Sequence, residues 1–180
     1  MFDLEQFIMD CREHAADSAH IRELLTGAVS EPAPLIRTLG EPTQAGVTRL
    51  HHGAGLTILN VRWAPGMTLK PHNHNMWAVV GVYMGREENI FWRRVGPRGP
   101  AAGSAEIEAA DARSLSKGVV HPLGRDIIHS VHNPLQRITG AIHIYGGDFF
   151  NAARSEWDSE ELREQPYDVE ENMRRLASHT

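Results

Sequence analysis

Apolar residues recur at near-helical spacing in the first part of the chain. They are Phe2, Phe7, Ile8, Cys11, Ala15, Ile21, Leu24 and Leu25. This spacing places them on one face of a helix, so we predict helix over 2–26, ending at Gly27. Pro32 and Pro34 follow closely. Because proline disfavours a helix interior, they predict a break at 31–35.

From about residue 46 to residue 150, the pattern changes to short apolar runs separated by Gly and Pro. Such runs, rich in β-branched and aromatic residues, are typical of strands. We predict strands at 55–63, 77–84, 89–95, 112–120 and 137–146. Many short strands joined by Gly/Pro turns favour a sandwich, a jelly roll or a barrel.

The remaining stretches predict two turns and a C-terminal helix. The charged run at 86–89 is typical of a solvated hairpin turn, and the Gly- and Pro-rich stretch 95–104 of a longer one. Residues 155–180 predict a helical tail, in which Asp168 with Glu171 three positions later suits a helix start.

Length and charge narrow the class of protein. A chain of 180 residues is of ordinary size for one domain and can bury a core. We therefore expect a single domain over 1–180, with a helical segment at 1–30, a β-barrel at 45–150 and the tail at 155–180. The net charge of −5 argues against nucleic acid as a partner. No apolar run approaches the roughly 20 residues needed to span a membrane.

Cysteine content bears on the compartment. The single cysteine, Cys11, excludes an internal disulfide and any cysteine-based zinc cluster. The N-terminal stretch is acidic and mixed, unlike a signal peptide. Both features suit a reducing compartment, so we expect a cytoplasmic protein, with its oligomeric state left open.

Histidine is abundant, at 11 of 180 residues, and His72 and His74 stand one residue apart before an apolar run. In a strand, residues of equal parity share a face, so two such imidazoles can bind one metal ion. A third ligand is expected from a neighbouring strand. We favour His129, in an apolar setting, over His132, which has the opposite parity.

Residues 66–85 resemble the first sequence motif of the cupins. Its glycines and histidines are matched by Gly66, His72, His74 and Gly85. The second cupin motif is matched more loosely by Pro122, Gly124, His129 and Asn133. The cupin glutamate is replaced by Ala78 or Val79, neither of which can bind a metal. The resemblance covers about 45–150 and implies an all-β, double-stranded β-helix (a jelly-roll barrel) with helical additions at both termini.

Within the cupins, three histidines without a carboxylate resemble the site of the cysteine dioxygenase group. In that group a His and a Tyr follow the third ligand on the next strand, and His143 and Tyr145 match them. The group's serine two residues before that histidine is Ala141 here. The group also binds the substrate carboxylate through an arginine in a Thr-Arg pair, which Arg49 matches, with Arg62 as its rival.

The resemblance implies an iron-dependent thiol dioxygenase, which uses O₂ to oxidise a small thiol to a sulfinic acid. The implied roles are metal ligand for His72, His74 and His129, catalysis for His143 and Tyr145, and substrate binding for Arg49. Two alternatives stay open: a cupin enzyme of other chemistry using Zn, Mn or Ni, and a non-catalytic cupin that binds a metal or a small ligand. The fold alone does not choose among them.

Overall fold

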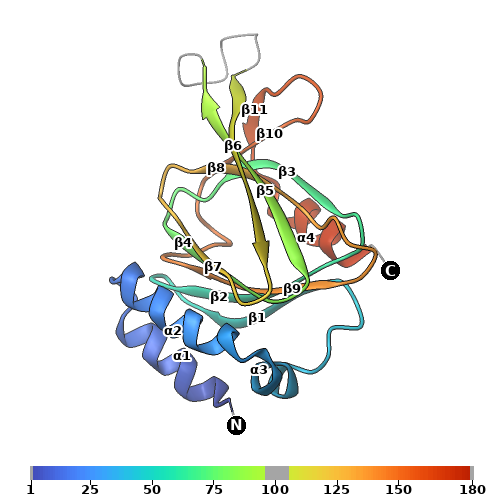
Figure 1. Cartoon of the computed structure of the whole chain (residues 1–180). Coiled ribbons are helices and arrows are strands. Elements are labelled where there is room, and N and C mark those ends of the chain that lie inside the picture. Colours follow the sequence, from blue (N-terminus) through green and yellow to red (C-terminus); the bar gives the residue numbers. More distant parts are fainter. Residues whose placement is uncertain (1, 96–105, 179–180) are drawn as a thin grey trace.

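Two antiparallel β-sheets form the body of the computed structural model, which describes residues 2–95 and 106–178 (Figure 1). The five-stranded sheet runs β1 (Gly46–His52), β2 (Thr57–Trp63), β9 (Thr139–Tyr145), β4 (Ala78–Met84), β7 (Val120–Leu123). The six-stranded sheet runs β11 (Glu164–Pro166), β10 (Ser155–Trp157), β3 (Thr68–Asn73), β8 (Ile128–His132), β5 (Arg86–Arg94), β6 (Ile107–Ser116).

The pairing of the strands identifies the fold. Strand β2 pairs with β9, β3 with β8, β4 with β7 and β5 with β6, all antiparallel. Counted in strands, the two members of each pair therefore lie equally far before and after the β5–β6 hairpin. Successive pairs alternate between the two sheets. A long hairpin wound in this way is a jelly roll, or double-stranded β-helix, which confirms the predicted fold class.

Three helices cover the outer face of the five-stranded sheet: α1 (Leu4–Glu13), α2 (Ser18–Ser30) and α3 (Pro32–Leu39) (Figure 1). Strand residues of one parity, such as Leu59 and Val61, pack inside the barrel. Residues of the other parity, such as Ile58 and Val79, pack with the helices. Because both faces are covered, β9 is buried at every position, which accounts for its long apolar run.

The predicted N-terminal helix and break are partly wrong. The helix over 2–26 is divided, because Asp17 starts α2 by accepting hydrogen bonds from two backbone N–H groups of its first turn. The second helix then continues through Gly27 to Ser30. The predicted break is confirmed only at Glu31, whose backbone is not helical, because α3 begins directly at Pro32. Proline is tolerated in a first turn because the N–H groups there have no intrahelical partner.

Two predicted features inside the barrel are also corrected. The charged run 86–89 is the start of β5, because the chain turns at Gly85, where φ is +79°. The strand predicted at 112–120 is divided between β6 and β7 by a turn that contains Gly118, where φ is +85°. The long turn predicted at 95–104 falls almost entirely outside the described residues.

The C-terminal tail is less helical than predicted. Residues 155–166 contribute the short strands β10 and β11, and the helix α4 covers only Val169–Ser178. It packs against β1, beside the barrel (Figure 1). Among the described residues, no helix is both long enough and apolar enough to cross a membrane.

Packing between α2 and β4 supplies a test of the helical cover. Leu25 of α2 is fully buried. A Cβ added to Gly81 of β4 would lie 2.7 Å from Cγ of Leu25, so helix and strand are in close contact. We expect Leu25→Ala to lower the free energy of unfolding by about 2–5 kcal/mol in urea denaturation. Met9→Ala, at a side chain 51% exposed on α1, should change it by less than about 0.5 kcal/mol. Equal effects would contradict this packing.

Candidate metal centre

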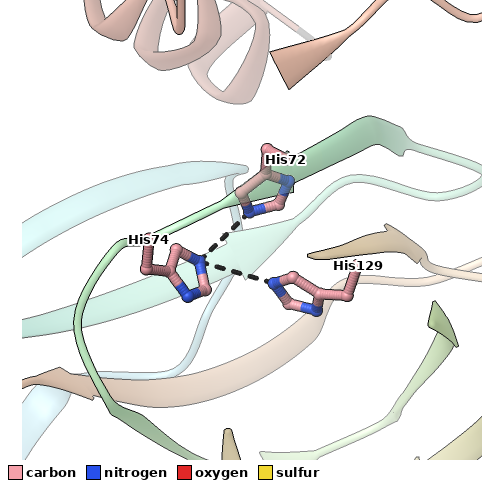
Figure 2. Close-up of side chains that lie close together, drawn as sticks. All are labelled: His72, His74 and His129. Carbon is pink, nitrogen blue, oxygen red and sulfur yellow. Dashed lines mark hydrogen bonds between the residues drawn. The ribbon is translucent and has the colours of Figure 1, made fainter. Parts of the chain in front are cut away.

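Strands β3 and β8 bring three histidines together (Figure 2). Their register places His72 directly opposite His129. The strand containing His72 ends at Asn73, and Asn75, with φ +55°, turns the chain, so His74 reaches the group from a turn. The continuous strand assumed from the sequence is therefore wrong, although the two side chains do converge. His132 lies on the opposite face of β8, where its Nδ1 forms a hydrogen bond with the hydroxyl group of Thr68.

The three Nε2 atoms point at one another. Nε2 of His74 lies 3.2 Å from Nε2 of His72 and 3.4 Å from Nε2 of His129. Nitrogens bound tetrahedrally to one ion at about 2.0–2.1 Å would be separated by roughly 3.3–3.4 Å. The spacing therefore fits a shared metal ion, and this group can hold one.

Hydrogen bonds to the other ring nitrogens set the orientation of two imidazoles. Nδ1 of His72 lies 3.0 Å from the backbone oxygen of Lys70, and Nδ1 of His129 lies 2.8 Å from Oδ1 of Asn89. Both partners are acceptors, so both Nδ1 atoms carry the proton and both Nε2 lone pairs are free. Partners of this kind are typical of metal-binding histidines.

Burial keeps the three histidines neutral. Desolvation lowers the pKa of His72 from 6.5 to about 4 and lowers the pKa values of His74 and His129 well below their usual value. A neutral imidazole is the form that binds metals. The group contains no carboxylate. Of the two residues at the cupin glutamate position, Ala78 packs with the barrel interior and Val79 with the helices.

The cavity beside the histidines is small and mostly apolar. Its volume is about 20 Å³, enough for about one water-sized molecule. Apolar side chains from β2 and β8 form its inner wall, and Tyr167 with two apolar side chains of α4, Met173 and Leu176, closes another side. A ligand larger than water therefore requires side chains of the cavity wall to shift.

His143 and Tyr145, both predicted to act at the site, line the same cavity. The rings of Tyr145 and His74 have centroids 5.0 Å apart, and the Tyr145 hydroxyl lies 3.1 Å from Nδ1 of His143. On its other side, Nε2 of His143 lies 3.2 Å from Oε1 of Glu87. The sequence interpretation missed Glu87, because it placed residues 86–89 in a solvated turn. The alternation of strand β5 would have pointed this carboxylate inward.

The arginine predicted to bind substrate lies elsewhere. Arg49 is exposed on β1, with its guanidinium 5.2 Å from the ring centroid of Phe150. Neither Arg49 nor Arg62 lines the cavity. Arg62 follows the inward-facing Val61 on β2 and so lies on the opposite face. The substrate-binding role of Arg49 stays a prediction, without support from proximity.

A different arginine, Arg154, does not line the cavity either, but it contacts two residues that do. Arg154, 7% exposed, lies between two rings of the cavity wall, 3.8 Å from the Phe149 centroid and 4.1 Å from the Tyr167 centroid. Its positive charge helps to lower the pKa values of His72 and His74. Its three guanidinium nitrogens are buried, and among the described residues they have a poorly aligned side-chain hydrogen bond with Tyr167. No sequence motif marked this residue, which the sequence interpretation placed just before the helical tail.

No protein-family model matches the sequence. The chain is similar to a cupin family protein with a double-stranded β-helix fold from Methanocaldococcus jannaschii (10% identity, TM-score 0.48, 61% of this chain and 85% of that one). It is also similar to a cupin superfamily protein from Desulfitobacterium hafniense (12% identity, TM-score 0.45, 59% of this chain and 80% of that one). A third similar structure is that of a conserved protein with a double-stranded β-helix domain from Klebsiella pneumoniae (12% identity, TM-score 0.45, 65% of this chain and 87% of that one). Similarities this distant carry no argument about function, and the fold assignment rests on the strand pairing.

Depressed histidine pKa values predict a specific loss of stability in acid. The folded protein keeps His72 neutral down to about pH 4, whereas the unfolded chain protonates it near pH 6.5. The contribution of neutral His72 to the free energy of unfolding is therefore complete above pH 6.5. It falls by about 3 kcal/mol as the pH is lowered toward 4. We expect urea denaturation of the metal-free protein to show a weaker dependence on pH in His72→Asn than in the wild type.

The matched control is His132→Asn, because His132 faces away from the group on β8. Its pH dependence should follow that of the wild type. The same dependence in the wild type and in His72→Asn would contradict the depressed pKa of His72.

Proposed function

We propose that the protein is an iron-dependent dioxygenase that oxidises a small thiol acid to a sulfinic acid with O₂. The observation that carries the proposal is the convergence of three buried, neutral histidines with no carboxylate among them. Three neutral ligands leave a bound divalent ion its full charge and leave positions open opposite them. This arrangement suits non-haem Fe(II), which when bound supplies the sites for thiol and O₂.

The residues of the chain fit such an ion. The nitrogen separations match a shared ligand set, and the acceptors on Nδ1 of His72 and His129 direct both free lone pairs inward. Apolar side chains, including Met173 and Leu176 of α4, form much of the cavity wall. Tyr145 places a hydroxyl group at the cavity wall, where it can hydrogen-bond a small bound molecule.

Arg154 supports an acidic substrate. A buried guanidinium whose side-chain hydrogen bond to Tyr167 is poorly aligned is costly, and contact with aromatic rings offsets only part of that cost. The guanidinium carbon lies over the rings of Phe149 and Tyr167, and the N–H edge of the guanidinium has donors that are not well paired. That edge matches the two oxygens of a carboxylate. A thiol acid bound with its sulfur at the histidines can place its carboxylate at this edge.

Metal content and O₂ uptake test the proposal. Wild-type protein loaded anaerobically with Fe(II) should hold about one iron per chain and consume O₂ when given 3-mercaptopropionate or cysteine, with the sulfinate identified by mass spectrometry. His74→Ala should lose stoichiometric iron because it removes one of three ligands, whereas His132→Ala should retain it. Iron binding without thiol oxidation would contradict the dioxygenase. Stoichiometric zinc without O₂ uptake would favour the alternative cupin chemistry.

Substrate selectivity tests the role of Arg154. Removing one charge-assisted interaction, in Arg154→Gln, should raise KM for 3-mercaptopropionate by roughly 10- to 100-fold. It should change KM little for cysteamine, which lacks a carboxylate. Arg62→Gln, on the outer face of β2, is the control. An equal loss on both thiols would mean that Arg154 is structural, and a selective loss in Arg49→Ala would return the role to Arg49.

A further inference from the structure

Glu87 is a carboxyl group deep inside the barrel. Its side chain is 1% exposed. Its Oε1 accepts a hydrogen bond of 2.6 Å from Nε1 of Trp63 and lies 3.2 Å from Nε2 of His143. Its Oε2 is buried and has no hydrogen-bond partner among the described residues. An apolar residue would fill this position at lower cost, so the carboxyl group calls for a functional explanation.

The two hydrogen bonds of His143 run in series. A carboxylate at Glu87 only accepts, so Nε2 of His143 carries the proton that bonds it. In the neutral imidazole, Nδ1 is then an acceptor, and it faces the Tyr145 hydroxyl at 3.1 Å. The Tyr145 hydroxyl therefore donates to His143, whose other side is held by Glu87. The order carboxylate, imidazole, hydroxyl is the one that makes an imidazole a base.

The reaction proposed above has a proton to dispose of. A small thiol is protonated at neutral pH, but it binds a metal as the thiolate. The hydroxyl of Tyr145 already donates its own proton to Nδ1 of His143, so it can accept a second proton only as it gives up the first. A proton that enters through its hydroxyl must therefore be matched by one that leaves toward His143.

A protonated His143 needs charge balance. The guanidinium of Arg154 and the divalent ion of the proposed centre are both positive charges close to the cavity. A buried imidazolium beside them is costly unless an anion contacts it. Among the described residues, Glu87 is the carboxyl group bonded to His143.

We propose that Glu87 is a positioning residue that makes His143 the acceptor, through Tyr145, of the proton released by the substrate thiol. The S–H bond breaks and its proton passes to the Tyr145 oxygen, while the Tyr145 proton passes to Nδ1 of His143. The sulfur keeps the electron pair, and the resulting imidazolium is balanced by the Glu87 carboxylate. This inference rests on the proposed thiol substrate, but it does not require that the thiol be oxidised.

Proton counting tests the step without turnover. Zinc-loaded protein, which cannot oxidise the thiol, is titrated calorimetrically with 3-mercaptopropionate at neutral pH in phosphate and in Tris. The dependence of the measured enthalpy on the ionisation enthalpy of the buffer gives the protons released per thiol bound. The wild type should release almost none, because His143 retains the proton. Glu87→Gln keeps the shape of the side chain and an acceptor oxygen but removes the charge that balances protonated His143. This variant should release about one proton per thiol bound.

Two further variants locate the effect. Glu88→Gln alters the neighbouring carboxylate, which bonds Arg86 and Ser114 away from the cavity, and it should match the wild type. Tyr145→Phe leaves Glu87 and His143 in place but removes the hydroxyl, and it should release about one proton. It also serves as the test if Glu87→Gln does not fold.

The outcomes separate this inference from the proposed function. Release of about one proton by the wild type, or of almost none by Glu87→Gln, overturns the inference alone. Thiol binding with the expected proton counts but no oxidation by the iron-loaded protein overturns the dioxygenase alone. Failure of the wild type to bind the thiol overturns both.

Discussion

The pairing of β3 with β8 determines the site. Backbone hydrogen bonding in this register sets His72 opposite His129, and the turn at Asn75 then returns His74 to the same point. A slip of one residue would direct one of the paired histidines to the outer face of the sheet. Strand β8 lies far from β3 along the chain, so the two strands meet only when the long hairpin is fully wound into a barrel.

The interior of this barrel is more polar than packing alone requires. Glu87, His143 and Tyr145 form one connected line, and Arg154 lies separately between two aromatic rings. Buried polar groups cost stability unless they are paired, and both Glu87 and Arg154 have nitrogen or oxygen atoms without a well-aligned partner among the described residues. The two groups have opposite charges and so require different partners. The carboxylate of a thiol acid would pair with Arg154, and a protonated His143 would balance the charge of Glu87.

The three histidines could be found from the sequence because the cupin-like motifs depend on local spacing. Strand parity was correct in preferring His129 to His132, but it does not explain His74, which lies in a turn. Short apolar runs between Gly and Pro predicted an all-β fold, and the resemblance to the cupin motifs selected the double-stranded β-helix. Glu87 was missed because acidic residues after a glycine are typical of exposed turns, and only the crossing of the chain to the second sheet at Gly85 reveals the inward face. Arg154 was missed because its partners, Phe149 and Tyr167, meet it through the winding of the C-terminal segment, which no local pattern encodes.

A crystal structure of the metal-loaded protein, with anomalous scattering, would show whether His72, His74 and His129 bind one metal ion. We expect a single ion bonded to the Nε2 atoms of all three histidines, at about 2.0–2.1 Å if the ion is zinc, with no carboxylate ligand from the chain. An ion held by His132 or by a carboxylate, or an ion bound elsewhere with the three histidines free, would contradict it.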